Sequence, residues 1–350
     1  MEKTIPSSIF DGKAVAIYTI GNAAVSARIS NFGARVIGID TPDRNGDIDD
    51  IVVGYNELDR YINNTGERFF GATVGRVANR ICKGRMTIDG VEYSLPVNNG
   101  VNSLHGGIKG IDMVAWDVVE HTGDALTLRY VAPDGQDGYP GNLTITMTFT
   151  ITDDNALDLK YEAVTDKATP VNLSQHAFFN LKGSRGGTIL DHSITIFADS
   201  ITPVDETLIP TGELMDVEGT PFDFRTPHLI GERINAGHRQ LVFGNGYDHN
   251  WVISGQAGTL RKACVLTEET SGRVLEVYTD QPGMQFYTGN FFPGTYDGKV
   301  KGIKVGFRDA LALETQNFPD AVNHPSFPSC ILRPGEKYTQ HTVYRFGVRG

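Results

Sequence analysis

The 350-residue sequence lacks the motifs that identify several large classes of enzyme. It contains no GxxxxGK(S/T) phosphate loop, no GxGxxG after a strand pattern, no HExxH, no GxSxG and no EF-hand loop. Redox chemistry with a nucleotide cofactor and phosphoryl transfer therefore have no support, and we expect no cofactor. Histidine pairs of the HxH type are also missing, which argues against a dedicated metal site, although His249 and His324 stay open as ligands.

Positive charge is scarce as well, because 31 lysine and arginine residues stand against 42 aspartate and glutamate residues, for a net charge of −11. Nucleic acids and anionic membranes bind through clusters of positive charge, so neither is an expected partner. The apolar stretch of about 18 residues that a membrane-spanning helix needs is absent. The first residues lack the basic and apolar segments of a signal peptide, and we expect a cytoplasmic protein.

Cysteine occurs only at positions 82, 264 and 330, far apart and without a CxxC motif. This usage is typical of free thiols in a reducing compartment. The sequence leaves open whether Cys82 and Cys330 come together.

What the sequence does contain is alternation of apolar and polar residues with a period of two. The clearest run is LTITMTFTIT at 143–152, and similar runs occupy 125–130, 156–165, 192–201 and 273–280. Each run predicts a strand with one buried and one exposed face. Helical patterns are limited to 57–64 and 227–234. Many strands without alternating helices predict an all-β protein of mainly antiparallel sheets, and we expect residues 1–350 to form a single large β-sandwich domain.

An ionisable side chain interrupts the apolar segment LSQHAFFNLKG at 173–183. A lone histidine in such a run, here His176, is more often a core residue than a functional one. Its interpretation therefore depends on the other polar segments of the chain.

Two of these segments carry groups suited to a polyhydroxylated ligand. The segment GRVANRI places Asn79 beside Arg80, which combines an amide with a planar fork of donors. The segment NSLHGG places His105 before two glycines, which allow the backbone to approach a ligand closely. Isolated arginines at strand ends are usually solvated, and this is the expectation for Arg76 and Arg85.

Two later segments add a carboxylate and an amide. Asp248 in GYDHNW is either a ligand-binding group or a cap of its own turn. Gln285 in QPGMQFYTGNFF is accompanied by four aromatic residues, Phe286, Tyr287, Phe291 and Phe292. Aromatic faces together with amide donors are typical of sugar-binding sites.

Glu314 ends the apolar strand pattern ALALE. Desolvation there should raise the pKa of its carboxyl group toward the range of a general base, although an ordinary salt bridge at the end of a strand is the alternative. Together with His176, Glu314 indicates an acid/base site for a carbohydrate.

The polar segments, taken in order, resemble those of the aldose 1-epimerases, also called galactose mutarotases. The matching segments are GRVANRI, SLHGG, PDGQDGYPGN, NLSQHAFFNL, GYDHNW, GMQFYTGNF and ETQNFPDAVNHPSFP, and the resemblance extends from about residue 69 to residue 350. It implies a cofactor-free isomerase on a large antiparallel β-sandwich. Such an enzyme interconverts the α and β anomers of free hexoses such as D-galactose and D-glucose.

The resemblance also implies a role for each site residue. His176 would be the general acid on the ring oxygen, and Glu314 would be the base on the anomeric hydroxyl. The sugar would be bound and oriented by Asn79, Arg80, His105, Asp248 and Gln285. Mutarotation requires only these two proton-transfer groups, and an imidazole can serve as the acid at neutral pH if a negative neighbour keeps it protonated.

The sequence departs from the family beside the histidine. Gln175, Ala177 and Phe178 stand where many relatives have Asn, Ser and Tyr, which removes a hydroxyl group and would alter sugar preference. The preferred sugar and the choice between a monomer and a homodimer stay open.

Three alternatives remain at this point. A glycosidase or sugar lyase would use Glu314 and Asp248 as paired carboxylates. A non-catalytic protein would bind sugar with the same amides and aromatic residues. A hexose-6-phosphate 1-epimerase on the same fold would need further cations, for which Arg76 and Arg85 are the candidates.

Overall fold

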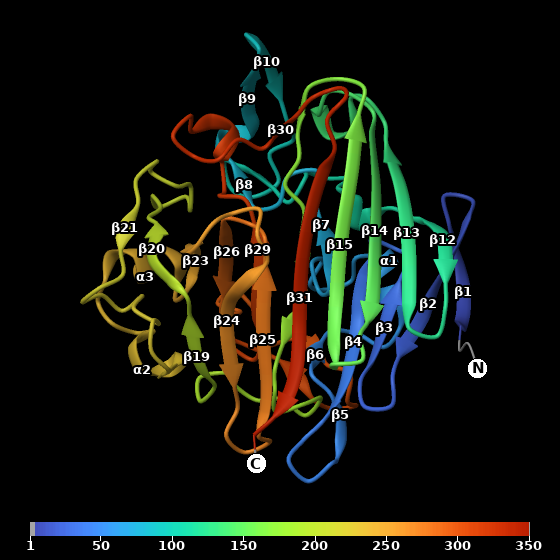
Figure 1. Cartoon of the computed structure of the whole chain (residues 1–350), viewed down its shortest axis with the longest axis vertical. Helices are drawn as coiled ribbons and strands as arrows, with labels where there is room; N and C mark the ends of the chain where they lie inside the picture. The colour runs from blue at the N-terminus through green and yellow to red at the C-terminus, as the bar shows by residue number, and fades with distance from the viewer. Residues whose placement is uncertain (1–3, 350) are drawn as a thin grey trace.

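The computed structural model describes residues 4–349, in which a nine-stranded antiparallel sheet forms one broad layer (Figure 1). The sheet has the order β12-β13-β14-β15-β31-β25-β24-β19-β22. Its strands are β12 (Asp117–His121), β13 (Ala125–Ala132), β14 (Leu143–Ile151), β15 (Ala156–Thr165), β31 (Tyr338–Val348), β25 (Arg273–Thr279), β24 (Arg261–Thr267), β19 (Ser193–Ile196) and β22 (His228–Leu229).

A seven-stranded sheet forms the second layer, and a five-stranded sheet built from the N-terminal part of the chain lies beside the two (Figure 1). The seven strands, in order, are β21 (Met215–Asp216), β20 (Ala198–Thr202), β23 (Asp248–Ile253), β26 (Gly283–Tyr287), β29 (Leu311–Gln316), β18 (Phe178–Phe179) and β6 (Val52–Val53). The five strands are β1 (Thr4–Phe10), β2 (Lys13–Gly21), β3 (Ser26–Ser30), β4 (Arg35–Pro42) and β5 (Ile48–Asp50).

Short two-stranded ladders and three short helices complete the described part of the chain. The ladders join β7 (Ala72–Val74) to β17 (Ser174–His176), β8 (Arg80–Ile81) to β11 (Ser103–Leu104), β9 (Arg85–Ile88) to β10 (Val91–Ser94), β16 (Thr169–Pro170) to β30 (Ile331–Leu332), and β27 (Tyr296–Asp297) to β28 (Lys304–Val305). The helices are α1 (Leu58–Ile62), α2 (Ile230–Arg233) and α3 (Arg239–Gly244).

The two large sheets pack face to face, as the sequence predicts. Along β14 every second side chain is buried, from Leu143 to Ile151, and the threonines between them lie on the outer face. One core cluster joins these residues to Trp251, Phe286 and Leu313 of the seven-stranded sheet. The prediction of an antiparallel β-sandwich is therefore confirmed, and its strands at 125–130, 143–152, 156–165 and 273–280 are found in the nine-stranded sheet.

The predicted strand at 192–201 is wrong in one respect, because the chain changes sheets within it. Strand β19 belongs to the nine-stranded sheet and β20 to the seven-stranded sheet. At the junction, the Phe197 N–H donates to the Ala263 carbonyl of the first sheet, and the Phe197 carbonyl accepts from Ser254 at the end of β23. The alternation continues through the switch, so periodicity alone does not reveal it.

The helical predictions hold in part. Helix α1 lies inside the predicted segment 57–64, whereas 227–234 divides into strand β22 and the short helix α2. Helix α3 is not predicted by the sequence pattern. Among residues 4–349 no helix is long and apolar enough to cross a membrane. Cys82, Cys264 and Cys330 are all free thiols.

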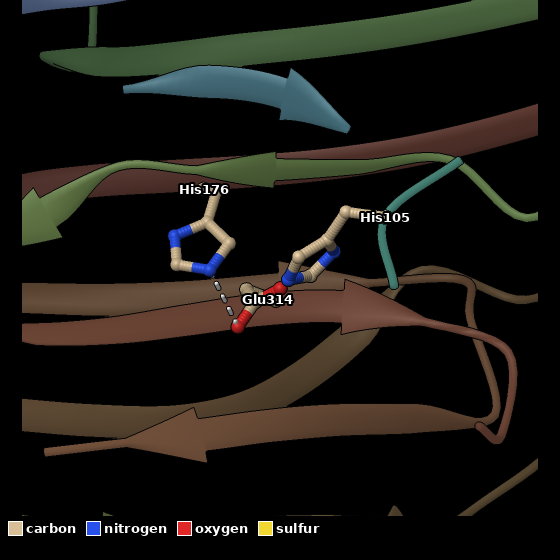
Figure 2. A group of neighbouring side chains, drawn as sticks. All are labelled: His105, His176 and Glu314. Carbon is tan, nitrogen blue, oxygen red and sulfur yellow. Dashed lines mark ion pairs between the residues drawn. The ribbon is translucent and has the colours of Figure 1, made fainter. Parts of the chain in front are cut away.

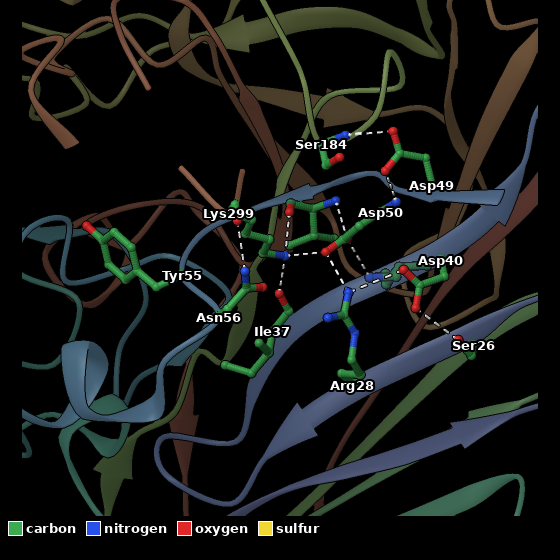
Figure 3. Close-up of polar contacts among 12 residues, drawn as sticks. Ser26, Arg28, Ile37, Asp40, Asp49, Asp50, Tyr55, Asn56, Ser184 and Lys299 are labelled. Carbon is green, nitrogen blue, oxygen red and sulfur yellow. Dashed lines mark hydrogen bonds and ion pairs between the residues drawn. The ribbon is translucent and has the colours of Figure 1, made fainter. Parts of the chain in front are cut away.

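A buried ion network ties the connection between β26 and β29 to the N-terminal sheet (Figure 3). Lys299, in the turn between β27 and β28, donates to the carbonyl oxygens of Ile37 and Val52 and to the carboxylate of Asp50. Asp50 also accepts a hydrogen bond from Arg28 over 2.6 Å. The network holds the connection between β26 and β29 in place. The first residues of this connection, from 288 onward, reach the site described next.

Candidate active site

Three predicted site residues lie on neighbouring strands of the seven-stranded sheet and point away from the sandwich core. On β29, Leu313 belongs to the core, so the pleat turns Glu314 to the opposite face. On β26, Phe286 belongs to the core and Gln285 takes the opposite face, directly across from Glu314 in the strand register. Asp248 begins the next strand, β23, and accepts a hydrogen bond of 2.7 Å from Gln285. Strand alternation thus gathers two carboxylates and an amide on one face.

His176 reaches the same face from a different part of the fold. It ends β17, which pairs with β7, and its carbonyl oxygen accepts a hydrogen bond of 3.1 Å from Gly71. Its imidazole lies over β29, where Nε2 is 3.4 Å from Glu314 Oε1 (Figure 2). Both side chains are buried. An imidazole and a carboxylate are therefore placed to act on two atoms of one substrate.

Asn79 and His105 form a second unit, held by reciprocal hydrogen bonds. The His105 N–H donates to the Asn79 carbonyl over 3.0 Å, and the Asn79 N–H donates to His105 Nδ1 over 3.1 Å. Both residues have positive φ angles, 63° and 50°, which are uncommon outside glycine and cluster at functional sites. A side chain at Gly106 would lie 1.8 Å from the Gly75 carbonyl oxygen. Gly106 thus permits close approach of this chain's own backbone, and approach to a ligand stays a prediction.

These groups meet at one cavity of about 190 Å³. The predicted site residues on its wall are Asn79, Arg80, His105, His176, Asp248 and Glu314. Gln285, the remaining predicted residue, is not part of the wall. It lies behind Asp248 and donates to that carboxylate, a position that suits orienting Asp248.

Aromatic side chains form much of the remaining wall. They are Phe69, Phe178, Tyr287 and Phe291. Two of the aromatic residues noted in the sequence do not face the cavity. Phe286 is on the core side of β26, and Phe292 packs edge-on against Phe70 with ring centroids 5.5 Å apart. The alternation of β26 separates Tyr287 from its neighbour Phe286.

Burial controls the protonation of the His176–Glu314 pair. It raises the pKa of Glu314 well above its usual value; the charge of Asp248 adds to the rise, and that of Arg80 opposes it. Burial lowers the pKa of His176 to about 4. The predicted rise for Glu314 is confirmed, whereas the pKa of His176 falls and is not held up by a negative neighbour. Relative to the same groups in water, burial favours the uncharged form of both side chains.

Among residues 4–349, Arg80 is the only lysine or arginine on the cavity wall. Its Nη2 lies 3.9 Å from Asp248 Oδ2, and its Nε donates to Asn99 Oδ1 over 3.0 Å. Burial raises the pKa of Asp248, while the charge of Arg80 and the hydrogen bond from Gln285 oppose that rise. Asp248 is thus bonded across strands, and the interpretation that it only caps its own turn is wrong.

One close group of potential metal ligands occurs among residues 4–349: His105, His176 and Glu314, whose ligand atoms lie within 4.8 Å of one another (Figure 2). The tautomer of His105 does not suit a metal. Its Nδ1 accepts the Asn79 N–H, so the one proton of the neutral ring is on Nε2. Burial keeps the ring neutral by lowering its pKa well below the usual value. A protonated Nε2 donates a hydrogen bond and has no free lone pair for a metal.

Four further residues considered from the sequence lie outside the cavity: Arg76, Arg85, His249 and His324. Arg76 is buried and donates to the carbonyl oxygens of Pro140 and Gly141. The expectation of a solvated arginine is therefore wrong for Arg76. It holds for Arg85, which is exposed and pairs with Glu92 on the next strand of its hairpin.

Four residues of the wall are missing from the sequence-based prediction: Glu67, Phe69, Asn99 and Leu104. Asn99 precedes the segment NSLHGG and Leu104 belongs to it, so their nearness to His105 was the available signal. Glu67 and Phe69 belong to TGERFFG, ahead of the GRVANRI segment. The composition of TGERFFG does not distinguish it from an ordinary surface turn.

The chain is similar to known proteins over nearly its whole length. A sequence model of the family described as aldose 1-epimerase matches residues 16–345. Galactose mutarotase of Rattus norvegicus is 44% identical over 338 residues, which cover 96% of this chain and 95% of that protein. Aldose 1-epimerase of Escherichia coli strain K12 is 35% identical over 346 residues, or 97% and 98% of the two chains. A crystal structure of an aldose epimerase homologue from C. elegans aligns with a TM-score of 0.88 and 32% identity, covering 96% of this chain and 100% of that one.

Proposed function

Because the chain belongs to the aldose 1-epimerase family, we propose that it is a cofactor-independent isomerase that interconverts the α and β anomers of free aldohexoses such as D-galactose and D-glucose. The observation that carries this proposal is the 3.4 Å approach of His176 Nε2 to Glu314 Oε1 in a polar cavity. Mutarotation needs one group that takes a proton from the anomeric hydroxyl and another that gives a proton to the ring oxygen. The two side chains supply both.

Glu314 is the base and His176 is the acid. The carboxylate takes the proton from O1 while the C1–O5 bond breaks and the imidazolium gives its proton to O5, which produces the open-chain aldehyde. Rotation about C1–C2 presents the other face of the carbonyl, and the two groups then run the same step in reverse. Each proton transfer contributes about 10²- to 10⁴-fold to the rate.

The pair holds one proton throughout this cycle. The proton is on His176 while the sugar is cyclic and on Glu314 while the sugar is open. Burial favours the second arrangement in the free protein, as the opposite pKa shifts of the two groups indicate. Sugar hydroxyls that donate to Glu314 stabilise its charged form. Substrate binding thus moves the proton to His176, where ring opening requires it.

The other polar groups hold the sugar in place. Asn79, Arg80 and Asp248 offer donors and acceptors for its hydroxyl groups, and Gln285 fixes Asp248 from behind. His105 contributes a permanent donor, because its Nδ1 is occupied by a backbone N–H and its proton is therefore on Nε2. The aromatic wall packs against the CH faces of the ring.

The charge of the cavity favours a neutral sugar over a sugar phosphate. The wall has three carboxyl groups, Glu67, Asp248 and Glu314, and only Arg80 as a cation. A phosphate dianion requires several positive donors. The two other arginines considered for a phosphate lie outside the cavity, so a hexose-6-phosphate 1-epimerase is disfavoured.

The setting that we propose is the cytoplasm, which suits three free thiols. The partner is a monosaccharide. The net charge of −11 disfavours nucleic acid and anionic membranes as partners. The oligomeric state that we propose is a monomer or a homodimer.

Polarimetry tests the proposed function. We expect the protein to accelerate the change in optical rotation of freshly dissolved α-D-galactose and α-D-glucose and to leave the final rotation unchanged. Methyl α-D-galactoside has no free anomeric hydroxyl and should give no change. Release of reducing sugar from an oligosaccharide would instead support a glycosidase. Sugar binding without any acceleration would support a binding protein.

A further inference from the structure

The mechanism above leaves one carboxyl group of the cavity wall without a role. Glu67 lines the cavity from the turn before β7, close in sequence to Phe69 on the same wall. It is only partly buried by the protein, and burial raises the pKa of its carboxyl group. A carboxylate at the wall of a sugar cavity is either a local structural group or a binding group for a hydroxyl.

The backbone of Glu67 is rigidly placed. Its N–H donates to the Tyr55 hydroxyl oxygen over 2.9 Å. The preceding residue is Gly66, where a side chain would lie 2.0 Å from the same hydroxyl, so the turn fits only with glycine there. In the side chain, Oε1 accepts a hydrogen bond of 3.1 Å from the Phe69 N–H. One carboxylate oxygen is thus committed to the turn.

The other oxygen, Oε2, makes no hydrogen bond or ion pair with residues 4–349, although two arginines are near. Arg68 donates from Nε and Nη2 to both oxygens of Asp112, over 2.8 and 2.9 Å. Arg35 donates to the backbone carbonyls of Arg68, Phe70 and Asp112. Because both guanidinium groups are engaged elsewhere, the cavity side of the Glu67 carboxylate is free to accept a hydrogen bond.

Glu67 is also well placed relative to the catalytic pair. Burial raises the pKa of Tyr287, and the negative charges of both Asp248 and Glu67 add to that rise, so the phenol lies within range of both carboxylates. Glu67 reaches the cavity from the turn before β7, whereas Asp248 reaches it from the start of β23, so the two carboxylates come from different elements. A sugar whose C1–O5 bond lies at His176 and Glu314 would therefore have Asp248 and Glu67 beside different hydroxyl groups.

We propose that Glu67 is a specificity-determining residue, whose free carboxylate oxygen accepts a hydrogen bond from a substrate hydroxyl other than the one on C1. This inference rests on the proposed function and extends it to the choice of sugar. A site built to bond a hydroxyl group discriminates strongly against an analogue that lacks it, because the carboxylate is then left desolvated and unpaired. The substrate class that follows is the neutral aldohexose with its full set of hydroxyls.

The test compares galactose with its 2-, 3-, 4- and 6-deoxy analogues, using binding calorimetry for affinity and polarimetry for kcat/KM. We expect Glu67→Ala to weaken galactose binding about 10- to 100-fold, as the loss of a charge-assisted hydrogen bond does. One of the deoxy sugars should bind the native protein more weakly than galactose does. The variant Glu67→Ala should bind that deoxy sugar and galactose with similar affinity. Glu67→Gln keeps an acceptor for the Phe69 N–H but loses the charge, so galactose affinity should fall about 3- to 10-fold.

The matched control is Glu57→Gln, an exposed carboxyl group ten residues earlier that lies outside the cavity and should change neither quantity. If Glu67→Ala weakens all five sugars by the same factor, Glu67 only shapes the turn and the proposal is overturned. Equal affinities of native protein and Glu67→Gln for every sugar would overturn it as well. A native protein that binds galactose but does not accelerate mutarotation would contradict the proposed function alone, because the calorimetric comparison still decides the role of Glu67.

Discussion

Two clusters of buried charge in this protein differ in how completely their polar atoms are bonded. In the network of Figure 3, the ammonium of Lys299 has three acceptors, and each oxygen of the Asp50 carboxylate accepts two hydrogen bonds. At the cavity, Oε2 of Glu314 and Nδ1 of His176 have no hydrogen-bond partner within the described chain. In the first cluster the ammonium and the carboxylate are fully bonded and Nε of Arg28 lacks a partner, whereas in the second the carboxylate itself has an unused acceptor.

This difference separates a structural role from a functional one. A buried polar atom without a partner costs free energy, so native proteins keep few of them. This chain keeps some in its core, such as the Tyr161 hydroxyl, but on the wall of a cavity a ligand can complete the bonding, as is expected of a sugar site. Burial alone does not distinguish the two clusters, because the side chains of Lys299, Asp50, Glu314 and His176 are all less than 10% exposed. The distinguishing property is satisfaction of hydrogen bonds.

The largest effect is expected from neutralising Glu314, the proposed catalytic base. Glu314→Gln removes the base while keeping the shape of the side chain, and His176→Asn removes the acid. Each change should lower kcat/KM for galactose about 10²- to 10⁴-fold, measured by polarimetry. Near-native turnover of Glu314→Gln would contradict its role as base. Gln285→Asn, which changes a residue behind the cavity wall, is the comparison variant and should retain far more activity.

The same Glu314→Gln variant should be at least as stable as the native protein at neutral pH. The folded-state pKa of Glu314 is raised, so the stability that this group contributes is present at low pH and is lost as the pH rises through the raised pKa. An amide has no such charge to desolvate, and gains for changes of this kind are about 0.5–2 kcal/mol. Urea unfolding at pH 5 and pH 8 measures this, and the advantage of the variant should be larger at pH 8.

The next effect concerns the satisfied network, where stability should fall and catalysis should not. Lys299→Met leaves Asp50 with Arg28 as its remaining cation, and loss of one partner of a buried ion network costs about 3 kcal/mol of unfolding free energy. The control is Lys304→Met in the same hairpin, where an exposed lysine pairs with Asp297 and stability should be nearly unchanged. At a temperature where the variant is folded, kcat/KM should stay within about threefold of native. If Lys299→Met instead lowered kcat/KM strongly and left the stability unchanged, the network around Lys299 would have a functional role and not a structural one.

How far the sequence predicts this molecule depends on the range of the interactions involved. Alternation along one strand predicts which residues share a face, and on that basis the β-sandwich is predicted correctly, while the catalytic role of Glu314 stays a prediction. Alternation does not predict which residues of a face bond to one another. The sequence therefore predicts that Gln285 binds sugar, whereas in the structure its amide donates to Asp248. The single-domain boundary at residues 1–350 stays a prediction.

The rest depends on contacts between segments far apart in the sequence. Lys299 lies in YDGKVKG, which is typical of an exposed turn, yet its ammonium is buried by carbonyls from β4 and β6. Glu67 lies in a turn that is positioned by Tyr55, twelve residues earlier, and that faces a cavity built from distant strands. No local sequence pattern identifies Lys299 or Glu67, because the role of each depends on whether a distant segment supplies a hydrogen-bond partner.

The smallest effect, a change in pH dependence, concerns the coupling between Glu314 and Asp248, two of the three carboxyl groups of the cavity. The His176–Glu314 pair carries one proton when it is active. We therefore expect kcat/KM to fall below about pH 4, where the pair gains a second proton on His176. It should fall again above the raised pKa of Glu314, where the pair loses its one proton. Asp248 contributes to that rise by like-charge repulsion, so Asp248→Asn should move the alkaline limb to lower pH while leaving the acid limb in place. Asp117→Asn, on the exposed strand β12, should move neither limb. The position of the limb is independent of the loss in sugar affinity that Asp248→Asn also causes. An alkaline limb that does not move would show that the two carboxyl groups titrate independently.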